Sequence, residues 1–256
     1  MGGSRWSRRT TLRWAVMVPG DHPETAWTGS ESGSDASGSH WVRWHAAYED
    51  PSSNLSLRLW AVQSMVRAAL DEISVTDAAP IRIVSLCAGQ GRDVIDVVAS
   101  HPRGAEVSAL LVELHPALVA FARERAASHG LADRIRVVEG DASQCRLYAG
   151  EVPADIVLVC GVFGNISPAD ITRTIQAMRG FCAPGGHVVW TRHRRPPDWT
   201  PTVRADFAAA GFTELDYVAP EGTVLAVGHH RLDGAAAPFD PGQRLFEFVG
   251  DGGNPA

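Results

Sequence analysis

Short apolar runs alternate with segments of helical periodicity between residues 81 and 231, and this alternation limits the possible folds more than any other feature. Five of the runs are IRIVSL (81–86), VSALLVE (107–113), IRVVEGD (135–141), ADIVLVCG (154–161) and HVVWTRH (187–193). A strand that is apolar along its whole length is typical of a parallel sheet, because helices cover both faces of such a sheet. Strands that alternate with helices therefore predict an α/β fold with a doubly wound, mostly parallel sheet. Two more strands are expected near 213–218 and 223–231, which makes seven.

The helices expected before and between these strands are marked by capping residues and by apolar periodicity. Ser53 is a suitable N-cap for a long helix that ends near residue 72. The apolar face of this helix is expected to contain Leu55, Leu59, Val62, Val66 and Leu70. A more complete start signal, SPAD at 167–170, predicts a helix over 166–180.

Changes in composition along the chain suggest its division into domains. Residues 20–40 are rich in Gly, Ser and acidic residues, so we expect residues 1–40 to be a disordered tail. The arginine pair of SRRTTLR (7–13) resembles an export signal, but the apolar run after it is short and no cleavage site follows. We therefore expect a cytoplasmic protein. Residues 41–80 are expected to form an N-terminal helical cap, residues 81–248 the main domain, and residues 249–256 a flexible tail.

Charge and cysteine usage exclude several classes of function. The net charge is −6 with no basic stripe, which argues against binding to long nucleic acid, where phosphate neutralisation dominates affinity. No apolar run approaches the roughly 20 residues of a membrane-spanning helix, so no membrane partner is expected. The four cysteines show no CxxC spacing and no Cys/His ligand pattern, so we expect no metal site.

The residues just after each strand are the candidates for binding a ligand. On a doubly wound sheet, ligands lie beyond the carboxyl ends of the strands, at the switch point of the strand order. The first strand is followed by Ala88, Gly89, Gln90 and Gly91, a tight turn with a helix N-terminus behind it that favours an anion. Glu113 ends the second strand, where a carboxylate can accept hydrogen bonds from a ribose diol. Asp141 follows the third strand, where it can accept one from an exocyclic amine.

Taken together, the stretch from about 81 to 230 resembles the Rossmann-like (class I) S-adenosylmethionine-dependent methyltransferases, and CAPGG at 182–186 also matches that family. The resemblance implies an antiparallel last strand and S-adenosylmethionine as the cofactor. It also implies the contacts of the cofactor: Ala88, Gly89, Gln90 and Gly91 around the methionine end, Glu113 at the ribose hydroxyls, Leu114 on the adenine, Asp141 and Ala142 at the adenine edge, and the backbone of Cys160 and Gly161 at the amino group and sulfonium.

Two positions depart from the pattern of this family. The family usually has an acid where this chain has Ser85, and its first motif glycine is Cys87 here. Ser85 weakens one expected polar contact near the methionine amine, and Cys87 places a side chain where backbone usually passes close to the cofactor. These departures are the support for one alternative, a non-catalytic S-adenosylmethionine-binding protein. A second alternative is a nicotinamide-linked oxidoreductase, which Val94 disfavours because the dinucleotide fingerprint has glycine or alanine there.

The segment after the fourth strand bears on the methyl acceptor. It reads CGVFGNIS (160–167) and lacks the Asn/Asp-Pro-Pro-aromatic signature that this family uses to methylate amino groups of nucleic-acid bases. The sequence therefore predicts methyl transfer to a small-molecule acceptor, without a metal. Such a reaction needs alignment and a dry site, and needs a base only where the acceptor loses a proton.

Four residues are candidates for contact with the acceptor or the methyl group, each with a structural alternative. His193, at the end of the fifth strand, is the candidate general base, or else a solvated loop histidine. Phe163 either faces the sulfonium as a cation–π partner or packs in the core. Asn165 either orients the acceptor or stabilises a turn, and Tyr48 is a candidate contact from the N-terminal segment.

Overall fold

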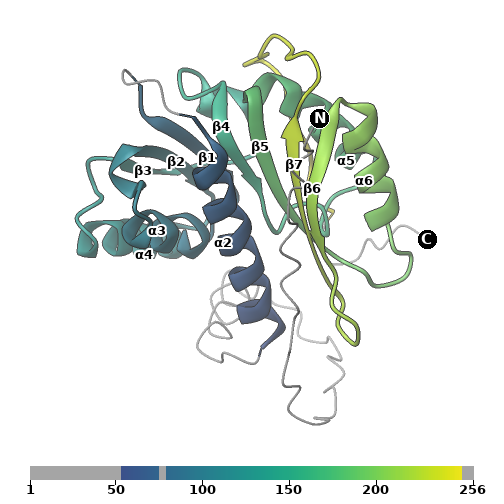
Figure 1. Cartoon of the computed structure of the whole chain (residues 1–256), viewed down its shortest axis with the longest axis horizontal. Helices are drawn as coiled ribbons and strands as arrows, with labels where there is room; N and C mark the ends of the chain where they lie inside the picture. The colour runs from purple at the N-terminus through teal and green to yellow at the C-terminus, as the bar shows by residue number, and fades with distance from the viewer. Residues whose placement is uncertain (1–52, 75–78, 250–256) are drawn as a thin grey trace, which may run out of the picture. The chain divides into compact units, whose positions relative to one another are not determined.

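The computed structural model describes residues 53–74 and 79–249, and these residues contain a seven-stranded sheet with the order β3-β2-β1-β4-β5-β7-β6 (Figure 1). The strands are β1 (Ile81–Leu86), β2 (Val107–Glu113), β3 (Ile135–Glu139), β4 (Ala154–Val159), β5 (Cys182–His193), β6 (Phe212–Val218) and β7 (Leu225–Leu232). β1 to β5 pair in parallel, and β7 is antiparallel to both of its neighbours. The predicted doubly wound sheet with an antiparallel last strand is confirmed. The tail predicted over residues 1–40, and Tyr48, lie outside the described residues.

The fifth strand begins earlier than the sequence predicts. Cys182 already pairs with Ala154 of β4, and a register shift separates this pair from the next, Ile156 with His187. The segment CAPGG, which reads as a loop because of its proline and glycines, is therefore the irregular start of β5.

The helices are α2 (Asn54–Glu72), α3 (Arg92–Ser100), α4 (Pro116–Ser128), α5 (Pro168–Phe181) and α6 (Thr200–Ala209), with short 3₁₀ turns at Gly104–Glu106 and Cys145–Tyr148. Two of the helices, α2 and α5, begin where their capping residues predict. The Ser53 hydroxyl accepts a hydrogen bond from the Ser56 amide at 3.0 Å, and Ser167 does the same for Asp170 at 3.1 Å. Both predicted N-caps are confirmed. None of the helices in the described part of the chain is long and apolar enough to cross a membrane.

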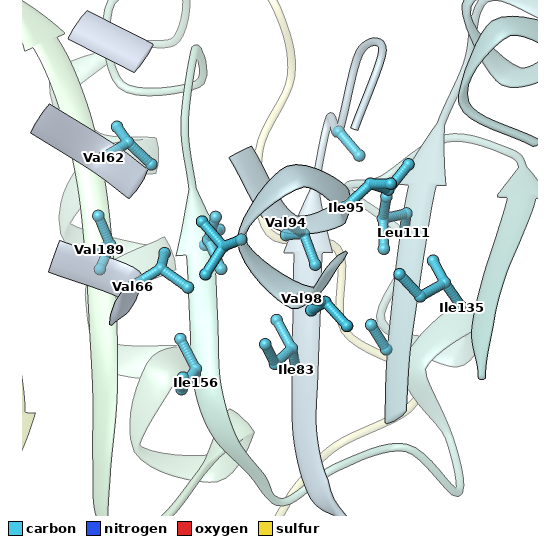
Figure 2. Packing of buried hydrophobic residues seen from close by; sticks show 14 of the residues in the cluster. Val62, Val66, Ile83, Val94, Ile95, Val98, Leu111, Ile135, Ile156 and Val189 are labelled. Carbon is cyan, nitrogen blue, oxygen red and sulfur yellow. The ribbon is translucent and has the colours of Figure 1, made fainter. Parts of the chain in front are cut away.

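One face of the sheet is covered by α2, α3 and α4. Figure 2 shows Val62 and Val66 of α2, and Val94 and Val98 of α3, packed against the sheet in a cluster of buried side chains. The strands contribute Ile83, Leu111, Ile135, Ile156 and Val189 to the same cluster. Burial of a side chain of this size stabilises the fold by about 1.5–3 kcal/mol. Because α2 packs on α3, β5 and β7, it shares the core of the sheet domain.

The other face of the sheet is covered by α5 and α6 and is rich in aromatic side chains. Trp190 of β5 is fully buried there, and its ring stacks on that of Phe207 from α6 at a centroid distance of 6.2 Å. Gly228 of β7 lies directly opposite Trp190 in the sheet. A Cβ atom at position 228 would lie 2.4 Å from the indole ring, so only glycine fits beside this tryptophan.

Candidate active site

The strand order places a switch point between β1 and β4. The chain leaves β1 through α3 on one face of the sheet and leaves β4 through α5 on the other face. The loops after β1 and β4 therefore diverge at the carboxyl edge, and doubly wound sheets bind their ligands in the crevice at such a switch point. The predicted site residues of the described chain lie on the loops and strand ends along this edge.

The loop after β1 is held by its own backbone hydrogen bonds. The Ala88 amide donates to the Val112 carbonyl at 3.0 Å, and the Gly91 amide donates to the Ala88 carbonyl at 2.8 Å. The Gln90 side chain accepts a hydrogen bond from Arg92 Nε at 2.6 Å. The loop is thus fixed against β2 before any ligand binds.

Three residues of this loop have positive φ angles. Gly89 and Gly91 have φ values of 56° and 67°, and a Cβ at Gly91 would lie 2.8 Å from Leu111 Cδ2. Conformation and packing therefore both require glycine at position 91. Cys87 also has a positive φ, of 50°, a region that costs a non-glycine residue about 1–2 kcal/mol. The loop keeps the turn even though it carries cysteine at the position of a family glycine.

Glu113 connects the loops after β1 and β2. Its Oε2 accepts a hydrogen bond from the Gly89 amide at 2.8 Å, and its Oε1 accepts one from the His115 amide at 2.8 Å. The residue is only 8% exposed, so these contacts fix the carboxylate in place. Each carboxylate oxygen has a second lone pair, so the group can still accept hydrogen bonds from a pair of hydroxyls. Leu114, the next residue, is 63% exposed and presents an apolar surface beside this carboxylate.

Asp141 follows β3 and makes three hydrogen-bonding contacts. Its Oδ1 accepts from the Ser143 amide at 3.0 Å, and its Oδ2 accepts from Gln144 Nε2 at 3.2 Å and Arg244 Nη2 at 3.3 Å. Partial burial raises the pKa of Asp141, but the bonds from Ser143 and Gln144 and the charge of Arg244 outweigh it and lower that pKa overall. Asp141 is therefore an ionised acceptor that also stabilises its own turn.

The segment around Arg244 crosses the loop after β3, which the sequence did not predict. The Leu245 amide donates to the Ser143 carbonyl at 2.9 Å. The neighbouring Ala142 is buried, and its carbonyl accepts the Tyr148 hydroxyl at 2.7 Å. The C-terminal segment thus closes the β3 end of the crevice. No local motif marks Arg244, and it lies far from Asp141 in the sequence, so their contact could not be predicted from neighbouring residues.

The end of β4 borders the crevice on its other side. Cys160 is half-buried, and the next residue, Gly161, has a φ of 76° and donates its amide to Thr191 Oγ1 at 2.9 Å. A Cβ at Gly161 would meet no atom within 4 Å, so there is open space beside this backbone. The Asn165 side chain donates to the Gly161 carbonyl at 2.8 Å, which supports the turn.

Phe163 lies in the core. Its side chain is fully buried, and its ring lies 6.0 Å from that of Trp190 and 6.3 Å from that of Phe207. Of the two roles considered for Phe163, this position favours packing over contact with the sulfonium. For Asn165, the bond to the turn likewise favours the structural role.

His193 ends β5 and lies beside the turn that follows β4. Its ring packs against Gly164, and the adjacent Arg192 donates to the Phe163 carbonyl. His193 Nδ1 is buried and has no hydrogen-bond partner among the described residues. Burial is the main cause that lowers the pKa of His193, and the charges of Arg192 and Arg195 lower it further. The imidazole is therefore neutral at pH 7 and able to accept a proton.

Asp93, in the first turn of α3, is a further candidate site residue that the sequence analysis did not name. Its Oδ1 is buried and has no hydrogen-bond partner among the described residues, and the same is true of the buried Ser85 hydroxyl. Burial raises the pKa of Asp93 to about 6, although Arg58 of α2 opposes the shift. After burial, the charge of Asp93 is the largest cause that raises the pKa of Cys160, so the carboxylate is electrostatically close to the end of β4. An acid in the first turn of a helix is common, so no pattern in the sequence singles Asp93 out.

Comparison with known sequences identifies a domain in this region. Residues 83–186 match a family described as a methyltransferase domain. An uncharacterised protein of Escherichia coli (strain K12), YnbC, is 24% identical over 132 residues, which cover 51% of this chain and 22% of that protein. The chain thus matches only about a fifth of the length of that relative.

Solved structures share the fold at low sequence identity. Magnesium protoporphyrin IX methyltransferase from Synechocystis, solved with bound S-adenosylmethionine, aligns with a TM-score of 0.57 at 12% identity, over 75% of this chain and 90% of that one. The 1,6-didemethyltoxoflavin N1-methyltransferase of Burkholderia thailandensis, solved with its substrate and S-adenosylhomocysteine, aligns with a TM-score of 0.53 at 16% identity, over 82% and 94%. The chain has the fold of these methyltransferases.

Proposed function

Residues 83–186 match a family described as a methyltransferase domain, and from this premise we propose that the protein is a Rossmann-like (class I) enzyme that transfers a methyl group from S-adenosylmethionine to a small-molecule acceptor. The observation that carries the proposal is the buried Glu113 carboxylate, which accepts the Gly89 amide at 2.8 Å beside the switch point. This bond joins the glycine loop to the end of β2, the two segments that must act together to hold an adenosyl ligand.

The residues at the crevice fit this cofactor. Glu113 has lone pairs left for two ribose hydroxyls, and the exposed Leu114 offers an apolar surface for the adenine ring. Asp141 is ionised and can accept the adenine amine. The loop Ala88–Gly91 would surround the methionine end, with the open space at Gly161 facing it.

The chain's own residues would orient the reactants and exclude water. When bound, S-adenosylmethionine supplies a methyl group already activated by its positive sulfur. Holding two reactants in line lowers the barrier without further chemistry from the protein. Where the acceptor must lose a proton, the neutral His193 would take it at Nδ1, which has no partner among the described residues.

Two lines of support favour a small molecule over a nucleic acid as the acceptor. The net charge is −6, and the segment 160–167 lacks the signature used for base amino groups. Two of the proteins with the same fold act on a porphyrin and on a toxoflavin precursor. Methylation of RNA in place of small molecules would refute this part of the proposal.

Isothermal titration calorimetry tests the choice of cofactor. We expect S-adenosylmethionine and S-adenosylhomocysteine to bind and NAD to give no heat. Tight binding of NAD without a response to S-adenosylmethionine would instead support an oxidoreductase. A panel of small acceptors, assayed by formation of S-adenosylhomocysteine, then tests turnover. Binding without turnover across a broad panel would favour the non-catalytic alternative.

A further inference from the structure

The charge of Asp93 acts across the switch point between β1 and β4. Asp93 follows the glycine loop by two residues, in the first turn of α3. Its charge acts on Cys160, the first residue after β4. Asp93 thus lies at the start of the helix behind the loop Ala88–Gly91, and its charge affects the residue that follows β4.

The surroundings of Asp93 lack a complete set of partners for a buried carboxylate. Oδ1 is buried and has no hydrogen-bond partner among the described residues. Burial dominates and raises the pKa of Asp93 to about 6, although the charge of Arg58 of α2 and the backbone amides of Asp93 and Val94 lower it. A buried carboxylate with an unpaired oxygen is costly unless a donor or a positive charge completes it. Oδ1 thus remains open to a donor, and a donor that is also positively charged would further offset the burial of the carboxylate.

The resemblance to the methyltransferase family suggests a ligand for this oxygen through the position of Ser85. The family that this chain resembles usually carries an acid at this position, near the amine of the methionine end. Here Ser85 is completely buried and its hydroxyl has no hydrogen-bond partner among the described residues. The chain therefore has a serine where that family usually has a carboxylate, and it has a carboxylate with one unpaired oxygen at the start of α3.

We propose that Asp93 binds the ammonium group of the cofactor's amino-acid end and so replaces the acid that the resembling family carries at the position of Ser85. This inference rests on the proposed function. The ammonium is a better match than the positive sulfur, because it offers N–H donors to Oδ1 and the sulfur offers none.

The size of the effect follows from the kind of bond. A hydrogen bond between charged groups contributes more than a neutral one, and its removal is expected to raise the dissociation constant about 10- to 100-fold. An amide at position 93 keeps the shape of the side chain and removes the charge. The loss should therefore appear only with ligands that carry the ammonium.

Two ligands separate the amino-acid end from the adenosyl end. S-adenosylhomocysteine carries the ammonium, whereas 5′-methylthioadenosine has the same adenosine and sulfur without the amino-acid end. We expect Asp93→Asn to raise the dissociation constant of S-adenosylhomocysteine about 10- to 100-fold, as measured by calorimetry. The dissociation constant of methylthioadenosine should stay within about twofold of the wild-type value. Asp96→Asn is the matched control, since Asp96 lies on the same helix and pairs with Arg125 at 2.6 Å. It should change neither affinity by more than about twofold.

A measurement on the wild type keeps the test independent of variant folding. Ligand binding to the carboxylate should release protons near pH 6, where Asp93 is partly protonated. Calorimetry in two buffers of different ionisation enthalpy measures this release. We expect release with S-adenosylhomocysteine and none with methylthioadenosine. The charged or titratable groups that act on Asp93 or respond to it are Arg58, Asp96 and Cys160.

The outcomes separate this inference from the proposed function. If the wild type binds neither ligand, the proposed function fails and the inference fails with it. If the wild type binds both, but Asp93→Asn leaves the affinity for S-adenosylhomocysteine unchanged or lowers the affinity for both ligands equally, the function stands and the role of Asp93 is overturned. Equal proton release with the two ligands also overturns it.

Discussion

Glu113→Gln should impair both the stability of the protein and its affinity for the cofactor. The glutamate side chain accepts two hydrogen bonds, one from the Gly89 amide and one from the His115 amide, each at 2.8 Å. Glutamine keeps the size of the side chain but offers only one acceptor oxygen. One buried amide at the crevice is therefore left without its partner.

The expected loss of stability follows from the one backbone amide that Glu113→Gln leaves without an acceptor. A buried donor without a partner costs about 1–3 kcal/mol of the free energy of unfolding. For a chain of this size each kcal/mol lowers the melting temperature by about 2–4 °C. The same change removes the charged acceptor of the ribose hydroxyls. We therefore expect the dissociation constant of S-adenosylhomocysteine to rise about tenfold or more.

Chemical denaturation and calorimetry measure the two effects separately. Glu139→Gln is the matched control, because Glu139 is exposed and occupies the paired position on the neighbouring strand β3. It should change neither quantity measurably. If Glu113→Gln keeps both the stability and the affinity of the wild type, Glu113 does not organise the crevice and the ribose is held elsewhere.

Three further predictions concern other parts of the molecule. His193→Ala should lower turnover about 10²–10⁴-fold if the acceptor must lose a proton, with unchanged cofactor affinity by calorimetry; equal turnover at every pH would place the base elsewhere. Gly228→Ala should lower the melting temperature by several degrees, because its Cβ would meet Trp190 at 2.4 Å, and an unchanged value would contradict the packing. Burial is the main cause that lowers the pKa of His229 to about 3, so the unfolded chain binds a proton that the folded chain does not once the pH falls below about 6.5. Stability should therefore fall with pH between about 6.5 and 3, by up to about 1.4 kcal/mol per pH unit for this group, and denaturation series should show a shallower fall for His229→Gln.

Local signals predicted the elements of the fold well. The apolar runs and the N-caps Ser53 and Ser167 depend on side chains within a few residues of each other, so one sequence is enough to recognise them. The early start of β5 was missed because Pro184 and two glycines signal a loop. Pairing of Cys182 with Ala154 overrides that local preference, and pairing between distant segments leaves no local trace.

The candidate site was predictable to the extent that it follows from strand ends. A parallel sheet brings the ends of consecutive strands to one edge, so the positions of Glu113 and Asp141 followed from the sequence. The partner of Asp141, Arg244, did not, because it comes from a distant segment that crosses the edge. The side-chain direction of Phe163 was equally undetermined, and only the packing with Trp190 and Phe207 gives it a place in the core.

The sequence by itself determined the parallel sheet, the glycine turn and the carboxylates at the strand ends, because each depends on the conformational preferences of neighbouring residues. The tertiary structure decided which carboxylates have partners. Glu113 is satisfied by amides of two loops, whereas the buried Oδ1 of Asp93 is unpaired among the described residues. Burial and hydrogen-bond satisfaction depend on which segments pack together, and these quantities set the charge of a carboxylate and its readiness to bind a cation.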